Sequence, residues 1–254
     1  IFVKGVNNVT AEIVLPHSLS FYGIDGSEIR YSTYDAANGN ILKFTGSANT
    51  QSFTFKNIAF SNAGEYALKI VQAAYINITD CTFTHNGWNG TGLDTVLPTA
   101  TTGIAGYDSS ASTLQAFYAG ANASNGGAMR IENITNIRVI GNVALENLRG
   151  LRIQDCGIGG AGFITRNVST KNIESGIYIA AGSLLGSHNI TTTMNVTSYN
   201  ANNGLLCIGG INNKFSQNEV NGNWNAGFCA WGSANATLRD CGLYDNNRSV
   251  YNGI

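Results

Sequence analysis

Four of the chain's few basic residues occupy the same place in a repeated pattern. Each stands at the centre of an apolar–X–apolar triplet: Leu42-Lys43-Phe44, Leu68-Lys69-Ile70, Met129-Arg130-Ile131 and Leu151-Arg152-Ile153. Later triplets place other residues at this centre, namely Tyr178, Leu206, Cys229 and Tyr251. Ammonium and guanidinium groups bind carboxylates and sulfates through charge-assisted hydrogen bonds. Because Lys and Arg number only 14 in all, four in one series indicate an anion-binding ladder, provided that the triplets stack.

A second series follows two positions after the first. It contains Glu132, Gln154, Ala180, Ile208 and Trp231. Together the two series predict a groove floor with a basic end (Lys69, Arg130, Glu132, Arg152, Gln154) and an apolar-aromatic end (Tyr178, Leu206, Trp231). Arg and Lys would hold the acidic groups of an extended, anionic polysaccharide, and Tyr178 and Trp231 would stack on sugar faces. The alternative is a solvated strand face with scattered charges.

Two kinds of catalysis would suit this floor. Hydrolysis needs two carboxyl groups, ~5 Å apart for retention or ~6.5–9.5 Å apart for inversion, and Glu132 with Asp94 or Asp108 would form such a pair. β-Elimination needs a cation to neutralise a uronate and a base for the proton at C5. Arg130 or Arg152 would be the cation. The candidate bases are Tyr178, His85 and Lys69.

A repeat of about 22 to 28 residues positions these side chains. A polar residue and a small apolar one open a strand, an Asn-rich turn follows, and Gly precedes the next triplet, as from Asn142-Val143 to Gly150-Leu151. Each such repeat is one supersecondary unit that buries its core by stacking. The sequence predicts an all-β solenoid of about 7–8 rungs, with three short parallel strands per rung and little helix.

Period-2 alternation places the outer residues of each strand inside and the middle one outside. The first strands are the triplets given above. Second strands include Ile76-Asn77-Ile78 and Ile137-Arg138-Val139, and third strands include Ile58-Ala59-Phe60, Cys81-Thr82-Phe83 and Val143-Ala144-Leu145. The last repeat is expected to run from Asp240-Cys241 to a first strand at Ser249-Val250-Tyr251.

One insertion interrupts the repeat. Residues 86–127 lie between a third strand and the next first strand, and they are rich in Gly, Ala, Ser and Thr. Long loops within a compact fold are commonly functional. We expect this loop to wall the groove and to contribute Trp88 and Tyr107 to ligand binding, with Asp94 and Asp108 as its acidic groups. Residues 1–254 are otherwise expected to form one domain, a segment of a longer chain or a mature form capped by a partner.

Composition narrows the choice of partners. The chain is 43% hydrophobic and only 11% charged, and it contains 33 Asn and 31 Gly. A net charge of −1 argues against nucleic acid as a partner, and no apolar run is long enough to insert into a membrane. Neither the five Cys nor the three His show metal-binding spacing, so no metal site or cofactor is expected. No EF-hand-like motif supports a Ca²⁺ site. Cys81 and Cys241 are expected to fill the core.

Asparagine is expected to have a structural role. The residues that follow the third strands (Asn86, Asn147, Asn172, Asn200 and Asn246) should form a ladder in which each amide bonds the turn of the next rung, where left-handed geometry also suits Asn. Ten Asn-x-Ser/Thr sequons occur, at Asn8, Asn77, Asn89, Asn122, Asn133, Asn167, Asn189, Asn195, Asn235 and Asn247. The favoured interpretation is that these sequons are ordinary strand sequences of the solenoid, in which Asn and Thr point outward and the apolar residue between them points inward. Glycosylation of a secreted protein is the alternative.

These repeats resemble the right-handed parallel β-helix of the pectate lyase-like superfamily over about residues 40–254. That fold occurs in lyases, hydrolases, epimerases, phage tailspikes and inert shafts, so the resemblance implies an architecture more than a reaction. Motifs typical of its enzymes are missing, including Gly-His-Gly and Arg-x-Pro-x-x-Arg. The resemblance favours a tailspike-like or other extracellular protein that recognises a polysaccharide. Such a protein would be located outside the cell or on a virion tail. In one variant of this hypothesis it also cleaves an acidic polysaccharide. Such a protein would self-associate, as a homotrimer for example, and thereby hide Leu206, Ile208 and Trp231. The alternatives are a non-enzymatic fibre subunit or adhesin, and a secreted lyase or glycosidase.

Overall fold

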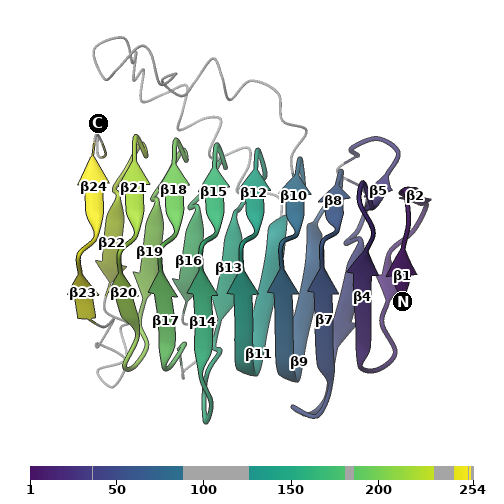
Figure 1. Cartoon of the computed structure of the whole chain (residues 1–254), viewed down its shortest axis with the longest axis horizontal. Helices are drawn as coiled ribbons and strands as arrows, with labels where there is room; N and C mark the ends of the chain where they lie inside the picture. The colour runs from purple at the N-terminus through teal and green to yellow at the C-terminus, as the bar shows by residue number, and fades with distance from the viewer. Residues whose placement is uncertain (36, 88–125, 181–185, 232–242, 251, 253–254) are drawn as a thin grey trace.

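The computed structural model describes residues 1–35, 37–87, 126–180, 186–231, 243–250 and 252. Every element assigned within these ranges is a β-strand, and neighbouring strands pair in parallel over about 7 turns of a solenoid. Figure 1 shows the rungs side by side along the long axis of the molecule. The predicted all-β parallel solenoid is therefore confirmed.

First and second strands belong to one 15-stranded sheet, because two long strands run through both positions. These long strands are β9 (Tyr66–Thr79) and β11 (Gly127–Ile140). The other first strands are β3 (Ile13–Val14), β6 (Leu42–Thr45), β13 (Leu151–Gln154), β16 (Ile177–Ala180), β19 (Leu205–Ile208) and β22 (Phe228–Trp231). The other second strands are β1 (Phe2–Val3), β4 (Leu19–Gly23), β7 (Ser52–Lys56), β14 (Gly162–Thr165), β17 (Ile190–Thr193), β20 (Lys214–Ser216) and β23 (Leu243–Asp245).

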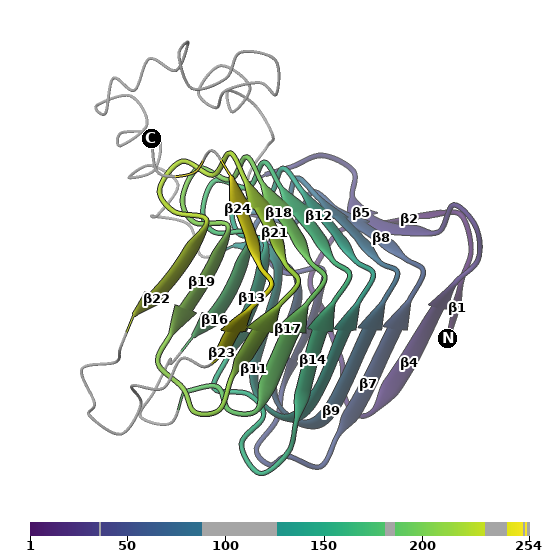
Figure 2. The same ribbon diagram turned by 60° about the vertical axis from the view of Figure 1, so that its left-hand side comes forward.

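Third strands form a separate nine-stranded sheet. They are β2 (Val6–Val9), β5 (Glu28–Tyr31), β8 (Ala59–Ser61), β10 (Thr82–Thr84), β12 (Val143–Leu145), β15 (Val168–Thr170), β18 (Val196–Ser198), β21 (Glu219–Asn221) and β24 (Arg248–Val250). Figure 2 shows the first, second and third strands on separate faces of the solenoid, whose body we call the prism. The predicted first strand at 249–251 was wrong, because Arg248–Val250 pairs with β21 as a third strand.

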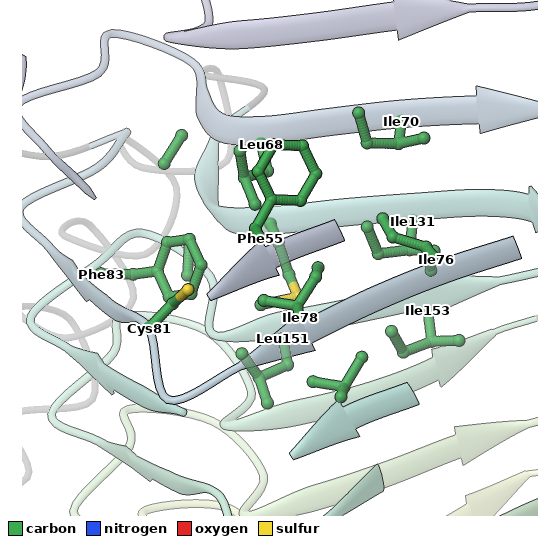
Figure 3. Close-up of a cluster of buried hydrophobic side chains, with 14 of the residues drawn as sticks. Phe55, Leu68, Ile70, Ile76, Ile78, Cys81, Phe83, Ile131, Leu151 and Ile153 are labelled. Atoms are coloured by element: carbon green, nitrogen blue, oxygen red, sulfur yellow. The ribbon is translucent and has the colours of Figure 1, made fainter. Parts of the chain in front are cut away.

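The interior is filled by columns of like side chains from successive rungs. Figure 3 shows Ile70, Ile131 and Ile153 on adjacent first strands, with Ile76 beside Ile131. Aromatic rings stack in the same manner: the ring centroids of Phe60 and Phe83 lie 5.3 Å apart, and the two ring planes are nearly parallel. These buried columns supply most of the apolar surface that folding removes from water, and each Å² of it stabilises the fold by about 25 cal/mol.

The predicted register of the third strand Val143-Ala144-Leu145 is wrong by one residue. Ala144 pairs with Phe83 and points inward, whereas Val143 and Leu145 are half-exposed. In consequence the inward partner of Cys81 is Asn142, whose side-chain oxygen accepts the Cys81 N–H at 2.9 Å. A slip of one residue exchanges the two faces of a strand, and here it exchanges a supposed core Val for a buried Asn.

Buried asparagines form two ladders rather than the one expected. The first links Asn86, Asn147, Asn172, Asn200, Asn223 and Asn252, and the second links Asn142, Asn167, Asn195, Asn218 and Asn247. In each step the side-chain oxygen accepts both the backbone and the side-chain N–H of the preceding Asn, as in the pair Asn86 and Asn147 at 3.0 and 2.9 Å. Asn246 does not belong to a ladder, since Asn252 takes the expected place.

The left-handed turn residue is the one that precedes the ladder Asn. Glu146, Lys171 and Tyr199 have φ of 56°, 53° and 53°, and each is followed by a ladder Asn. Non-glycine residues adopt this conformation at a cost of order 1–3 kcal/mol when the surrounding structure imposes it. The ladder hydrogen bonds provide that constraint, because they fix the next residue inside the prism.

The sequons fall into two structural classes. Asn77-Ile78-Thr79 has the expected out–in–out arrangement, with Ile78 fully buried. Asn167-Val168-Ser169 and Asn195-Val196-Thr197 are the reverse, since their Asn belong to a ladder and are 0% exposed. Asn89, Asn122 and Asn235 lie outside the described residues. The sequon excess is thus in part a consequence of the ladder.

Cys81 and Cys156 are expected to stay protonated and unreactive in the folded protein. Burial raises the pKa of each thiol to about 12, against about 8.5 in an unfolded chain. At pH 8 iodoacetamide should label neither thiol in the native state but both in guanidinium chloride, as read by peptide mass spectrometry. The shift also stabilises the fold below the unfolded pKa, and this contribution is lost as pH rises from there toward 12. Native labelling at the unfolded rate would contradict the burial of both groups. Cys241, the other predicted core residue, lies outside the described residues.

Candidate functional site

The anion-binding ladder predicted from the basic residues stacks as the repeat indicated. Lys43 pairs with Lys69, Lys69 with Arg130, Arg130 with Arg152, Arg152 with Tyr178, Tyr178 with Leu206, and Leu206 with Cys229. Parallel strands hold such neighbours about 4.8 Å apart. We call this outward column, together with the second series beside it, the first-strand face; Figure 2 shows β13, β16, β19 and β22 side by side along it. Tyr251 lies outside the described residues.

The second series also keeps its predicted register. Glu132 pairs with Gln154, Gln154 with Ala180, Ala180 with Ile208, and Ile208 with Trp231. Gln154 is only 5% exposed, and Leu206 in the neighbouring column is only 6% exposed. The single chain therefore already covers Leu206, and self-association is not needed to do so. The side chain of Trp231 lies outside the described residues.

Most cations of the column have a carboxylate beside them. Lys43 Nζ lies 3.1 Å from Glu12, Lys69 Nζ lies 3.7 Å from Glu65, and Arg130 Nη2 lies 2.6 Å from Glu132. Burial raises the pKa of Glu12, but hydrogen bonds from Asn40 and Lys43 outweigh it and leave this pKa below its usual value. The column is thus a row of ion pairs rather than a bare positive surface.

Arg152 has different surroundings. Its Nε and Nη2 donate to Gln154 Oε1 at 3.1 and 2.8 Å, and its Nη1 lies 3.5 Å from the Tyr66 hydroxyl. The guanidinium carbon also lies 5.4 Å from the centroid of the Tyr178 ring, within the range of a cation–π contact. Among the described residues, its side-chain partners are neutral.

Tyr66 and Arg149 form an edge to this face that the sequence reasoning missed. Arg149 donates to both Glu174 oxygens, at 2.6 and 2.5 Å, and its Nη1 lies 3.4 Å from the Tyr66 hydroxyl. Tyr66 is on β9 and Arg149 precedes β13, so the phenol spans the intervening rung. Gly127 occupies that rung, and a Cβ there would lie 2.6 Å from the Arg149 carbonyl oxygen. Burial lowers the pKa of Arg149, but Tyr66 and Glu174 raise it, with a net upward shift.

The candidate bases are not equally placed. Burial raises the pKa of Tyr178, and the charge of Arg152 only partly offsets this, so the phenol is a poor base at neutral pH. His85 bonds Glu146 at 2.9 Å in the turn after β10 and is not part of the column. Glu132 lies on the first-strand face, bonded to Arg130 and 3.4 Å from Gln154 Nε2.

The insertion leaves and re-enters the solenoid at one point beside this face. A Cβ on Gly87 would lie 2.7 Å from the carbonyl carbon of Gly126, so the two glycines touch. Gly127 N–H donates to the backbone carbonyl oxygen of Glu65, and Ala128 N–H donates to the backbone carbonyl oxygen of Arg149. The predicted loop residues Trp88, Asp94, Tyr107 and Asp108 lie outside the described residues.

The described residues contain no group of three or more His, Cys, Asp or Glu with the geometry of a metal centre. In the same part of the chain there is no helix whose length and hydropathy would let it span a bilayer.

Comparison with known proteins agrees with the architecture. The family model described as a right handed beta helix region matches residues 17–184. No curated protein matches the sequence. A solved structure, tailspike protein 3 of bacteriophage CBA120, aligns at 14% identity with a TM-score of 0.27, over 96% of this chain and 50% of the tailspike chain. This chain thus spans about half of the tailspike's length, and a similarity this weak carries no functional conclusion.

Proposed function

This chain belongs to the right-handed β-helix family, and from that premise we propose that its first-strand face binds an extended polysaccharide. The observation that carries the proposal is the unbroken outward register from Lys69 through Arg130 and Arg152 to Tyr178. A linear ligand laid along the solenoid axis would meet one of these side chains at every rung.

The chemistry of the face suits sugars. Sugar hydroxyls both donate and accept hydrogen bonds, and the Arg130–Glu132 and Arg152–Gln154 pairs offer donors and acceptors side by side. Because each pair is held by its own hydrogen bonds, little side-chain entropy would be lost on binding. Tyr178 and Ile208 add apolar surface. Nucleic acid is disfavoured, since its affinity depends on unneutralised cations.

Cleavage of the bound polymer is a further part of the proposal. Glu132, beside Arg130 on this face, would be one carboxylate of the reaction, and Asp94 or Asp108 would supply a second one from the insertion. Hydrolysis or elimination of an envelope or matrix polysaccharide would take place outside the cell. We therefore place the protein on a virion tail or in the extracellular space, self-associated as a homotrimer or another assembly.

Retention on a glycan array tests the binding function. We expect the wild-type protein to be retained by at least one acidic polysaccharide, and Tyr178→Ala to weaken this about tenfold, as loss of an aromatic contact at an interface commonly does. Phe163→Ala removes an exposed aromatic ring from another face and should bind normally. If the wild-type protein also releases reducing ends or unsaturated uronate from the bound polymer, and Glu132→Gln does not, the protein cleaves its ligand as well as binding it. Retention of no glycan would reject the proposal.

A structural role in a fibre is the second candidate. The two asparagine ladders favour it, because they run through successive rungs and stiffen the prism along its axis. A fibre subunit would bind no glycan on the array and would appear as a stable assembly in native mass spectrometry.

A further inference from the structure

The cations of the first-strand face are not equivalent as ligand sites. Lys43, Lys69 and Arg130 each have a carboxylate within 4 Å, supplied by Glu12, Glu65 and Glu132 respectively. A carboxylate of the ligand would have to displace these partners, and it would be repelled by them if it did not. Like charges brought together at an interface oppose binding and act as a device of specificity.

Arg152 is the exception in this column. Nε and Nη2 are used by Gln154, and Nη1 contacts Tyr66. A guanidinium carries five N–H groups, so one N–H on Nη1 and one on Nη2 remain for a ligand. N–H groups on the two terminal nitrogens of a guanidinium can donate together to both oxygens of a carboxylate.

The group is also held in place. Gln154 is 5% exposed and Tyr66 is 0% exposed, so both hydrogen-bond partners are fixed by packing. The Tyr178 ring lies along the same guanidinium. A bidentate site that is already oriented loses little entropy on binding, and a half-buried cation is screened less than an exposed one.

From these contacts we propose that the face selects a polysaccharide of sparse charge, with one ligand carboxylate seated on Arg152 and neutral sugars over the ion-paired rungs. This inference rests on the proposed polysaccharide-binding function and adds the charge density of the ligand to it. A polymer with a carboxylate on every sugar would set successive charges against Glu132 and Glu65, so it should be a poorer ligand.

An array of polysaccharides graded in carboxylate density tests the inference. It carries polygalacturonate, with a carboxylate on every sugar, hyaluronan and other polymers in which acidic and neutral sugars alternate or acidic sugars are rarer, and neutral dextran. We expect a sparsely charged polymer to be retained best, and Arg152→Gln to weaken it at least about tenfold, the usual size for loss of a hydrogen bond to a charged group. Arg138→Gln is the matched control, since Arg138 is exposed on the second-strand part of the neighbouring strand β11, away from the first-strand face.

Glu132→Gln tests the same idea without touching Arg152. By freeing Arg130 it should raise the retention of polygalacturonate severalfold relative to wild type. Best retention of polygalacturonate or of dextran by the wild type would overturn the inference while leaving polysaccharide binding intact. The same holds if folded Arg152→Gln binds like wild type. Retention of no polymer would overturn the proposed function itself, and this inference with it.

Discussion

Asn167→Ala is expected to lower the free energy of unfolding by about 4 kcal/mol, since each buried polar group left without a partner costs roughly 1–3 kcal/mol. Asn167 is 0% exposed and stands in the middle of its ladder. Its amide donates to Val139 and to Asn195, each at 2.9 Å, and its oxygen accepts two N–H groups of Asn142. Alanine would take these partners from the Val139 carbonyl oxygen and from the Asn142 N–H groups inside the prism, whereas Asn195 Oδ1 would keep the backbone N–H of residue 167.

Urea unfolding followed by circular dichroism measures this loss. Asn77→Ala is the control, because Asn77 also opens a sequon but faces outward, and among the described residues its side chain only accepts a hydrogen bond from the Thr79 hydroxyl at 2.8 Å. That variant should lose less than about 1 kcal/mol, the usual net value of one hydrogen bond. Equal stabilities for the two variants would show that the ladder contributes nothing.

Phe83→Ala is expected to cost about 3–5 kcal/mol, the usual range for truncation of a buried aromatic residue. Phe83 is fully buried and stacked on Phe60. Its partner on the next rung is Ala144, whose small side chain cannot fill the cavity. The backbone around the site is fixed by parallel pairing on both sides, so collapse of the cavity is limited.

The exposed Phe163 provides the comparison. Phe163 lies on β14 and is 49% exposed, so Phe163→Ala should change stability by less than about 1 kcal/mol. Thermal or urea unfolding of both variants decides the matter. A small effect at Phe83 would mean that the interior repacks freely, which a ladder-bound solenoid should not allow.

The architecture was predictable because one repeat unit fixes both strand type and stacking. Gly150, Gly176 and Gly204 recur before the first strands, and a Cβ on Gly150 would lie only 2.0 Å from the Gly176 carbonyl oxygen. Because these glycines recur at a constant position, the register of the first strands could be assigned correctly from the sequence. The third strands lack such a marker. Asn142 was taken as the polar residue that opens a strand with Val143 in the core, although Asn167, Asn195 and Asn218 repeat it with the same period.

The candidate site was predictable only as a list of outward positions. Ion pairing depends on residues from other segments: Glu12 reaches Lys43 from an earlier rung, and Glu65 lies four residues before Lys69 in a corner. Tyr66 reaches Arg149 and Arg152 because Gly127 leaves the intermediate rung without a side chain. A contact between side chains two rungs apart leaves no periodic pattern in the sequence from which it could be predicted. The roles assigned to Glu132 and to the insertion stay predictions.

The contact between Gly87 and Gly126 has an evolutionary consequence. Since the chain departs and returns at a single point, whatever is spliced between these two glycines leaves the pitch of the prism unchanged. The length and sequence of this segment can therefore change in evolution while the stacking of the rungs on either side stays the same.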